Sequence, residues 1–412
     1  MIESFDPPPC LLLGPGPSNA EPRVLQAQAR ALLGQFDPRF TAVMNEVMAL
    51  ARAVFQTRNE RTFPVSGTSR AGIEAVMASV IEEGDRVVVG SCGRFGWLLE
   101  DIARRYRAEV RVVEAPWGEP IDPDAVRRAL GEAPTKCVAL VHGETSTGVL
   151  QPLEVIAAAC REHDALLLVD AVVTLGGCEV AVDAMGWDAA MAGTQKCLGG
   201  PSGMAPITYN ARVEAVIAAR RTPVASNYLD LVQLQRYWSP ERWNHHTVPT
   251  SLVYGLHEML RLVLAEGLAA RWERHRRVGR AMAAGLAALG LRRFGNAAYA
   301  LPFLTPVWVP EGVDDAAVRA ALLYDHGIEI GTAFGPLAGR IWRIGTLGYN
   351  ARMESVRRLL AALEVVLPAH GFAVPRGEAI AAAETAYASA PPAAPPPDPH
   401  GRLAPTAEAT NR

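Results

Sequence analysis

The stretch ALLLVDAV, residues 165–172, decides the fold of this chain. Five successive apolar residues are followed by Asp170, which is typical of a strand buried on both faces that ends at a polar edge. Strands of this kind occur in parallel sheets that helices cover on both sides, and ligands bind beyond their carboxyl ends. The stretch therefore predicts an α/β sheet with Asp170 at the ligand-binding edge.

Similar patterns precede this stretch along the chain. Short apolar runs that resemble buried strands lie at 85–90, 108–115 and 136–143. Amphipathic helical patterns lie at 72–83, 96–107, 122–132 and 152–163. Strands that alternate with helices at this spacing favour a doubly covered, mostly parallel sheet.

The pattern changes in the last third of the chain. A long helical stretch covers 252–290, and it is followed by a strand at 305–310, a helix at 314–327, a strand at 340–345 and a helix at 352–367. Alanine and proline dominate from about residue 375, which predicts a disordered tail. A helix over part of EAIAAAETAYA is the other interpretation of that tail. We expect an N-terminal arm (1–20), a large α/β domain (21–260), a small α+β domain (261–372) and a disordered tail (373–412).

Composition excludes several classes of protein. The chain has 412 residues and a net charge of −3, from 40 basic and 43 acidic residues, so it lacks the basic field of a nucleic-acid-binding protein. No apolar run is long enough to span a bilayer, and the N-terminus lacks the pattern of a secretory signal. Six cysteines without a CxxC pair are no disulfide framework. We expect a cytoplasmic enzyme with neither nucleic-acid nor membrane partners.

Lysine is scarce in this chain. Only Lys136 and Lys196 are lysines, and the other basic residues are arginines. Where arginine supplies almost all of the basic charge, a lysine that remains is expected to do something that arginine cannot, such as forming a Schiff base. Lys196 lies in the glycine-rich segment AGTQKCLGGPSG (192–203), so it is the candidate nucleophile, although a solvated loop lysine is the other interpretation.

Two further segments carry polar residues next to predicted elements. VSGTSRAGIEA (65–75) leads through a small-residue turn into a helix, and such a helix N-terminus can bind a phosphate. VHGETSTGVLQPL (141–153) places His142 and three hydroxyl residues after a strand, where one hydroxyl could instead cap the helix at 152–163. Neither a GxxxxGK[ST] loop nor a GxGxxG motif is present, so ATP and NAD are not favoured, and no metal site is expected.

These candidates together match the needs of one cofactor. A phosphate requires a helix N-terminus, a pyridinium nitrogen requires a carboxylate such as Asp170, and an aldehyde requires a lysine amine such as Lys196. Pyridoxal 5'-phosphate has all three groups.

Five motifs resemble those of the class V aminotransferases, which have the fold-type I architecture. They are LLLGPGPSN (11–19), HGETSTGVLQPL (142–153), LLLVDAVVTLGG (166–177), AGTQKCLGGPSG (192–203) and RIWRIGTLG (340–348). The resemblance covers residues 10–368 and is strongest toward the alanine/serine–glyoxylate branch. It implies a mostly parallel seven-stranded large domain and a smaller α+β C-terminal domain.

The resemblance also implies roles for individual residues. Lys196 would bind the cofactor aldehyde and move the substrate proton, and Asp170 would pair with the pyridinium. Val172 and Phe95 would pack on the two faces of the ring. The other cofactor contacts implied are Thr145 to the ring hydroxyl and, at the phosphate, Thr68, Ser69, Arg70, Gln195, His246 and Thr247. His246 and Thr247 belong to a segment that reaches the neighbouring subunit in this family, so a homodimer with shared sites is implied.

Four residues are expected to contact substrate. Gly16 lies in the first motif, and Arg343 would bind the substrate carboxylate as a two-pronged clamp. Asn244 stands where alanine-using glyoxylate enzymes usually have tyrosine, and Gln35 stands where they often have His or Ser. Two amides suit a ureido group better than a methyl group. This pair is similar to the pattern of (S)-ureidoglycine–glyoxylate aminotransferases, which implies a reaction giving glycine and oxalurate.

Three alternatives remain at this point. An alanine– or serine–glyoxylate aminotransferase would use the same machinery. A cysteine desulfurase of the same fold would need a catalytic cysteine near Arg343, and no cysteine follows Cys197. A non-enzymatic α/β dimerisation scaffold would leave Lys196 as an ordinary loop lysine.

Overall fold

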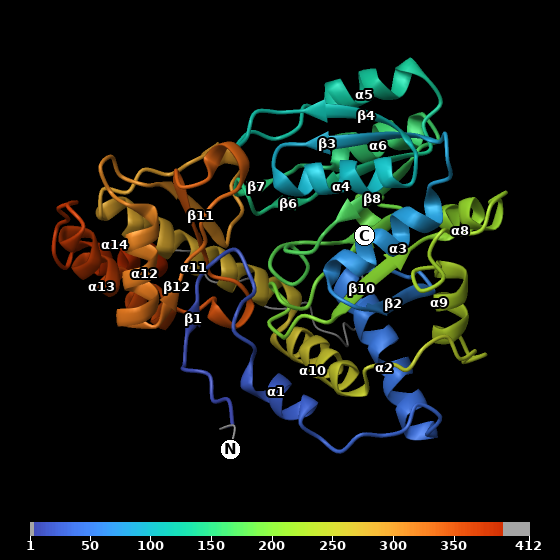
Figure 1. Cartoon of the computed structure of the whole chain (residues 1–412), viewed down its shortest axis with the longest axis horizontal. Coiled ribbons are helices and arrows are strands. Elements are labelled where there is room, and N and C mark those ends of the chain that lie inside the picture. The colour runs from blue at the N-terminus through green and yellow to red at the C-terminus, as the bar shows by residue number, and fades with distance from the viewer. Residues whose placement is uncertain (1–3, 390–412) are drawn as a thin grey trace, which may run out of the picture.

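A computed structural model describes residues 4–389 of the chain. Its larger unit is built on a seven-stranded sheet with the strand order β2-β10-β9-β8-β5-β3-β4 (Figure 1). These strands are β2 (Arg61–Ser66), β3 (Arg86–Ser91), β4 (Glu109–Glu114), β5 (Cys137–Val141), β8 (Leu166–Asp170), β9 (Ala189–Met191) and β10 (Met204–Tyr209). Only β10 runs antiparallel to both of its neighbours, so the predicted mostly parallel sheet is confirmed.

Helices cover this sheet. The helices of the larger unit are α1 (Pro22–Gln28), α2 (Pro38–Phe55), α3 (Ser69–Val80), α4 (Arg94–Arg105), α5 (Pro123–Glu132), α6 (Glu154–Glu162), α7 (Val182–Met185), α8 (Ala211–Ala218), α9 (Leu231–Trp238) and α10 (Thr250–Glu266). Helix α3 packs on β2, β9 and β10, and α4 packs on β3, β4 and β5. Except on the edge strand β4, the apolar strand residues are almost fully buried between these layers, and this burial is the main favourable contribution to folding. A short hairpin, β6 (Gly143–Glu144) with β7 (Val149–Leu150), extends the segment after β5.

The smaller unit has its own core. It contains α11 (Leu268–Ala288), β11 (Leu304–Trp308), α12 (Asp315–His326), β12 (Ile328–Glu329), β13 (Ile341–Gly345), α13 (Met353–Ala369) and α14 (Glu378–Ala388), with 3-10 turns at Ala297–Tyr299, Gly335–Leu337 and Gly348–Asn350. Figure 1 shows α11 to α14 gathered on the left, beside the sheet of the larger unit. The N-terminal strand β1 (Leu11–Leu12) pairs with β12, so the N-terminal segment adds Leu11 and Leu13 to this second core.

One sequence expectation is wrong in part. The segment 378–388 was expected to be disordered as part of the tail 373–412, but it forms α14 and packs on α11 and α13. Ala379 and Ala383 are fully buried there, and Arg277 of α11 lies over the Tyr387 ring at 4.3 Å. The alanine-rich sequence therefore forms a helix whose small side chains pack against its neighbours, and it is not a solvated chain here. Residues 390–412 lie outside the described part of the chain, so disorder at that end of the tail stays a prediction.

The long helical stretch expected at 252–290 is two helices, because the chain turns at Gly267, whose φ is +85°. Within residues 4–389, the structure contains no helix that combines the length and hydropathy needed to cross a membrane.

Candidate active site

A cavity of about 330 Å³ lies at the carboxyl end of β8. Nine of the residues predicted from the sequence line it: Gly16, Thr68, Ser69, Arg70, Phe95, Asp170, Val172, Gln195 and Lys196. They come from the N-terminal segment, the starts of α3 and α4, the end of β8 and the loop between β9 and β10. The sheet thus brings together side chains that are up to 180 positions apart in sequence, from Gly16 to Lys196.

Lys196 lies beneath the N-terminal segment. Its Nζ donates a hydrogen bond to the Pro15 carbonyl at 2.7 Å, and Ser18 Oγ donates to the Lys196 carbonyl at 3.1 Å. Gly16 covers the amine so closely that a Cβ there would lie 2.4 Å from Nζ. Burial, followed by the positive charge of Arg343, lowers the pKa of Lys196 to about 8. The amine is therefore closer to its nucleophilic, neutral form than an exposed lysine is.

Asp170 is buried at the end of β8. Its carboxylate accepts a hydrogen bond from the Val172 N–H at 2.9 Å. Burial raises the pKa of Asp170 to about 7, and the neighbouring charge of Glu144 adds to this effect. A cationic partner would stabilise its ionised form, which is what a protonated ring nitrogen supplies.

The first turn of α3 presents free hydrogen-bond donors to the same cavity. Thr68 is the N-cap residue, and its side chain makes no capping hydrogen bond. Ser69 Oγ is held by Gln195 Nε2 at 3.1 Å. Hydroxyls and unpaired N–H groups at the start of a 12-residue helix form an anion site, so this part of the cavity suits a phosphate.

Glu144 is a site residue that the sequence analysis did not select. Its carboxylate accepts hydrogen bonds from the backbone N–H of Phe95 at 2.9 Å and of Gly96 at 3.3 Å, at the start of α4. It also accepts from the backbone N–H and the Oγ of Ser146 at 2.9 and 2.6 Å. The carboxylate therefore holds the helix that carries the Phe95 ring. Ser146 Oγ in turn accepts from the Arg94 N–H at 2.9 Å, so this hydroxyl caps α4 and not the helix at 152–163.

Arg343 and Thr145 lie together beside the cavity. Arg343 is buried, and it donates to the carbonyls of Thr332 at 2.6 Å and of Thr145 at 3.1 Å. Its guanidinium lies 4.6 Å from the centre of the Phe334 ring. The terminal nitrogen Nη2 makes no hydrogen bond with the described residues, so it is available to a carboxylate. Thr145 is buried, and it does not line the cavity.

The remaining four predicted residues lie elsewhere on the chain. Gln35 and Asn244 contact each other, with Gln35 Nε2 donating to Asn244 Oδ1 at 3.4 Å. His246 Nε2 lies 2.8 Å from Ser66 Oγ, directly before the Gly67–Thr68 turn, and Thr247 is exposed. None of the four lines the cavity around Lys196 of the same chain.

The residues present fit pyridoxal 5'-phosphate. The cavity combines a lysine amine of lowered pKa, a buried carboxylate without a cationic partner at hydrogen-bond distance among the described residues, and a helix N-terminus with free donors. These are the three groups that this cofactor requires. Groups of three or more His, Cys, Asp or Glu side chains that could hold a metal ion do not occur in the described part of the chain.

Comparisons with known proteins point the same way. The family model described as aminotransferase class-V matches residues 13–341. The (S)-ureidoglycine–glyoxylate transaminase of Bacillus subtilis is 51% identical in an alignment 397 residues long that covers 92% of this chain and 95% of that protein. The crystal structure of ureidoglycine–glyoxylate aminotransferase from B. subtilis superposes with a TM-score of 0.92 at 52% identity, covering 94% of this chain and 100% of that one. A structure of alanine–glyoxylate aminotransferase from Nostoc sp. gives a TM-score of 0.88 at 46% identity, covering 89% and 97%.

Proposed function

Because this chain belongs to the class V aminotransferases, we propose that it transfers the amino group of (S)-ureidoglycine to glyoxylate, giving glycine and oxalurate. Family membership confirms two earlier expectations: the protein is an aminotransferase and its cofactor is pyridoxal 5'-phosphate. The alternative of a non-enzymatic scaffold is therefore wrong.

When bound, the cofactor supplies an aldehyde that carries the amino group and a ring that withdraws electrons from the substrate. We propose that the Lys196 amine holds this aldehyde at rest and then takes and returns the proton at the substrate α-carbon. Asp170 keeps the ring nitrogen protonated, because its carboxylate is buried and gains a cationic partner. Thr68, Ser69 and Arg70 hold the phosphate.

Arg343 binds the carboxylate that both reactants carry. Its contacts with the Thr332 and Thr145 carbonyls and with the Phe334 ring fix the plane of the guanidinium before substrate arrives. A single clamp suits glyoxylate, which has one carboxylate and no side chain. Because the side chain is already ordered, less conformational entropy is lost when substrate binds.

The observation that carries the choice of amino donor is the contact between Gln35 and Asn244. Because Gln35 Nε2 donates to Asn244 Oδ1, the pair leaves Gln35 Oε1 without a hydrogen-bond partner in the described chain, although that atom is buried. The Asn244 amide nitrogen is likewise free to donate. The pair thus offers one acceptor and one donor, which match the N–H and C=O of a ureido group. The methyl group of alanine would leave both without a partner, and for the buried Gln35 Oε1 this costs about 1–3 kcal/mol, whereas the exposed Asn244 amide can bind water.

We propose that the amide pair completes the site of a second subunit, in a homodimer with shared active sites. The pair does not line the cavity of its own chain, and large apolar side chains beside it are exposed. Leu32 is 70% exposed, Phe36 78% and Trp243 43%. A second copy of the chain would cover these side chains and bring Asn244 and His246 toward the neighbouring cofactor.

Mixed dimers test the shared site. Lys196→Ala and Asn244→Tyr chains are each expected to be inactive with ureidoglycine. When the two are co-expressed with different affinity tags and the mixed dimer is isolated, one site should recover an intact Lys196 and an intact Asn244. Recovery of about half the activity of the wild-type dimer supports sharing, and no recovery contradicts it.

Donor specificity tests the reaction. Glycine formation from glyoxylate would be followed with ureidoglycine generated in the same tube, and with alanine and serine in parallel. We expect ureidoglycine to exceed the other donors in kcat/KM by tenfold or more, and the Gln35→His/Asn244→Tyr variant to reverse this order. Asn227→Tyr is a matched control, because Asn227 forms a similar exposed amide contact with Gln233 at 3.3 Å.

Alanine or serine as the better donor would leave the cofactor chemistry intact and refute the interpretation of the amide pair. The protein would then be an alanine– or serine–glyoxylate aminotransferase. We also propose a cytoplasmic location, which the six free cysteines support, since thiols stay reduced in that compartment.

A further inference from the structure

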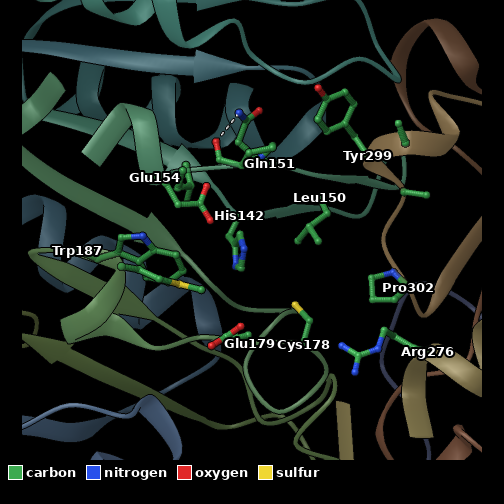
Figure 2. Close-up of a pocket in the computed structure, with 15 residues that line it drawn as sticks. His142, Leu150, Gln151, Glu154, Cys178, Glu179, Trp187, Arg276, Tyr299 and Pro302 are labelled. Carbon is green, nitrogen blue, oxygen red and sulfur yellow. Dashed lines mark hydrogen bonds between the residues drawn. The ribbon is translucent and has the colours of Figure 1, made fainter. Parts of the chain in front are cut away.

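A second cavity lies between the two units of the chain, away from Lys196. It has a volume of about 500 Å³, and Figure 2 shows side chains from both units around it. Most of the residues in its wall are apolar, including Leu150, Met185 and Trp187. A concave apolar wall with a few polar groups is typical of small-molecule sites.

His142, a largely buried residue, presents a polar atom to this cavity. The side chain is 6% exposed, and its Nδ1 lies 3.0 Å from Thr174 Oγ1. The ring packs edge-on against Trp187 at 5.0 Å between centroids, and burial lowers the pKa of His142 to about 4. Nε2 makes no hydrogen bond with any described residue, and Figure 2 shows the ring pointing into the cavity. Nε2 faces the cavity as a free polar atom, so a ligand or water there can form a hydrogen bond with it.

Opposite charges stand at the same end of the cavity. Glu179 and Arg276 lie on either side of Cys178 (Figure 2). They form no ion pair with each other. Glu179 accepts no hydrogen bond within residues 4–389, and Arg276 is held there only through Nε, by Glu273 at 2.9 Å. The gap between the two side chains therefore offers one free carboxylate and one guanidinium with free terminal nitrogens.

We propose that this cavity is a second binding site, outside the lysine cavity, for an α-amino acid with an apolar side chain. The ammonium group would pair with Glu179 and the carboxylate with Arg276, since a zwitterion carries both charges one carbon apart. The side chain would lie along Leu150, Met185 and Trp187. A ligand with only one charge would leave one of the two protein charges unpaired.

The site is connected to the catalytic sheet. The His142 N–H donates to the Asp170 carbonyl at 3.0 Å, and the Thr174 N–H donates to the Ala171 carbonyl at 3.1 Å. The adjacent ends of β5 and β8 therefore carry Asp170, whose carboxylate faces the lysine cavity, and His142, whose imidazole faces the second cavity.

Equilibrium dialysis with labelled L-leucine tests the proposal. The holoenzyme is first treated with borohydride, which fixes the cofactor on Lys196 so that the amino acid cannot react in the lysine cavity. We expect one saturable site for each chain. The competitors 4-methylpentanoate and 3-methylbutylamine, which each lack one of the charges of leucine, should bind at least tenfold more weakly.

Surface variants locate the site without threatening the fold. Arg276→Gln and Glu179→Gln should each weaken leucine binding by about tenfold or more, since each removes one charged partner. Arg280→Gln is the matched control: Arg280 lies on the same helix and binds the same Glu273 at 3.1 Å, but it does not line this cavity. Absence of saturable binding up to about 50 mM, equal binding of either competitor, or binding unchanged in both Arg276→Gln and Glu179→Gln would overturn the proposal.

Discussion

Replacing Gly16 by alanine tests how the N-terminal segment positions the reactive lysine. The backbone of Gly16 has a φ of +114°, and an added Cβ would lie 2.4 Å from Lys196 Nζ, 2.5 Å from Cδ and 2.9 Å from Cε. These atoms belong to a side chain that is also held by the Pro15 carbonyl. The lysine can relieve the overlap only by leaving that position.

Two costs combine in this substitution, and a second glycine separates them. The left-handed backbone costs an L-residue about 1–2 kcal/mol of stability at either position. Gly84 has a φ of +83° and open space around its Cβ position, so Gly84→Ala carries the backbone cost alone. In Gly16→Ala the amine must also move by about 1 Å, and a displacement of that size at a reacting group lowers rate by about 100-fold.

The assay compares both variants with wild type. We expect Gly16→Ala to lose about 100-fold in kcat/KM and most of its borohydride-fixed cofactor, while Gly84→Ala stays within twofold. Thermal unfolding should show similar losses of stability in the two variants. If Gly16→Ala is as active as Gly84→Ala at equal stability, the reasoning that Gly16 positions Lys196 is refuted.

Three further predictions concern other parts of the structure. Glu144→Gln should lower the free energy of unfolding by about 2–4 kcal/mol, because an amide leaves two of the four buried donors unpaired; a loss below about 0.5 kcal/mol in denaturant titrations would contradict this. Asp170 should make cofactor-free protein less stable as pH rises: its pKa is raised from 3.8 to about 7, so its stabilising contribution is complete below pH 3.8 and is lost by about pH 7. Thermal scans across this range should show a shallower decline for Asp170→Asn, and identical slopes would refute the assignment. Truncation after residue 374 should lower the unfolding temperature by several degrees while the turnover of folded enzyme persists, since it removes α14 from the second core; an unchanged melting temperature would show that α14 adds no stability.

The fold was predictable where burial leaves a strong local pattern. β3, β5 and β8 are runs of apolar residues between polar turns, and their positions in the structure agree with the predicted strands to within two or three residues. β9 has only three residues, two of them alanines, and β10 contains Pro206. Those strands depend on pairing with neighbours, which sequence periodicity does not report.

The helix α14 was only the second interpretation of its segment, for a similar reason. Its alanines match a solvated, low-complexity segment equally well until a partner surface is known. That surface is α11, where Gly285 lies so close that a Cβ would meet the Ala379 carbonyl at 3.1 Å. The decisive contact therefore joins residues about ninety positions apart.

Site residues divide in the same way. Lys196 and Asp170 were identified from local patterns: Asp170 directly follows an apolar run, and Lys196 lies in a glycine-rich segment. Glu144 lies inside a quoted motif, but its function depends on the N–H groups of Phe95 and Gly96, almost fifty positions earlier. Only the packing of α4 against the segment after β5 reveals why a carboxylate is buried there.

The properties of the reactive amine show how the parts of the site depend on one another. The pKa of Lys196 is lowered to about 8 first by burial and then by the charge of Arg343, so about a tenth of the amine is neutral at pH 7. In our proposal Arg343 also binds the substrate carboxylate, which cancels the charge that depresses the lysine pKa. Arg343→Gln should therefore weaken carboxylate binding and also raise the pKa of Lys196 in cofactor-free protein. A clamp that acted on substrate alone would leave that pKa unchanged, so the coupling distinguishes a simple anchor from a charge that prepares the amine before substrate arrives.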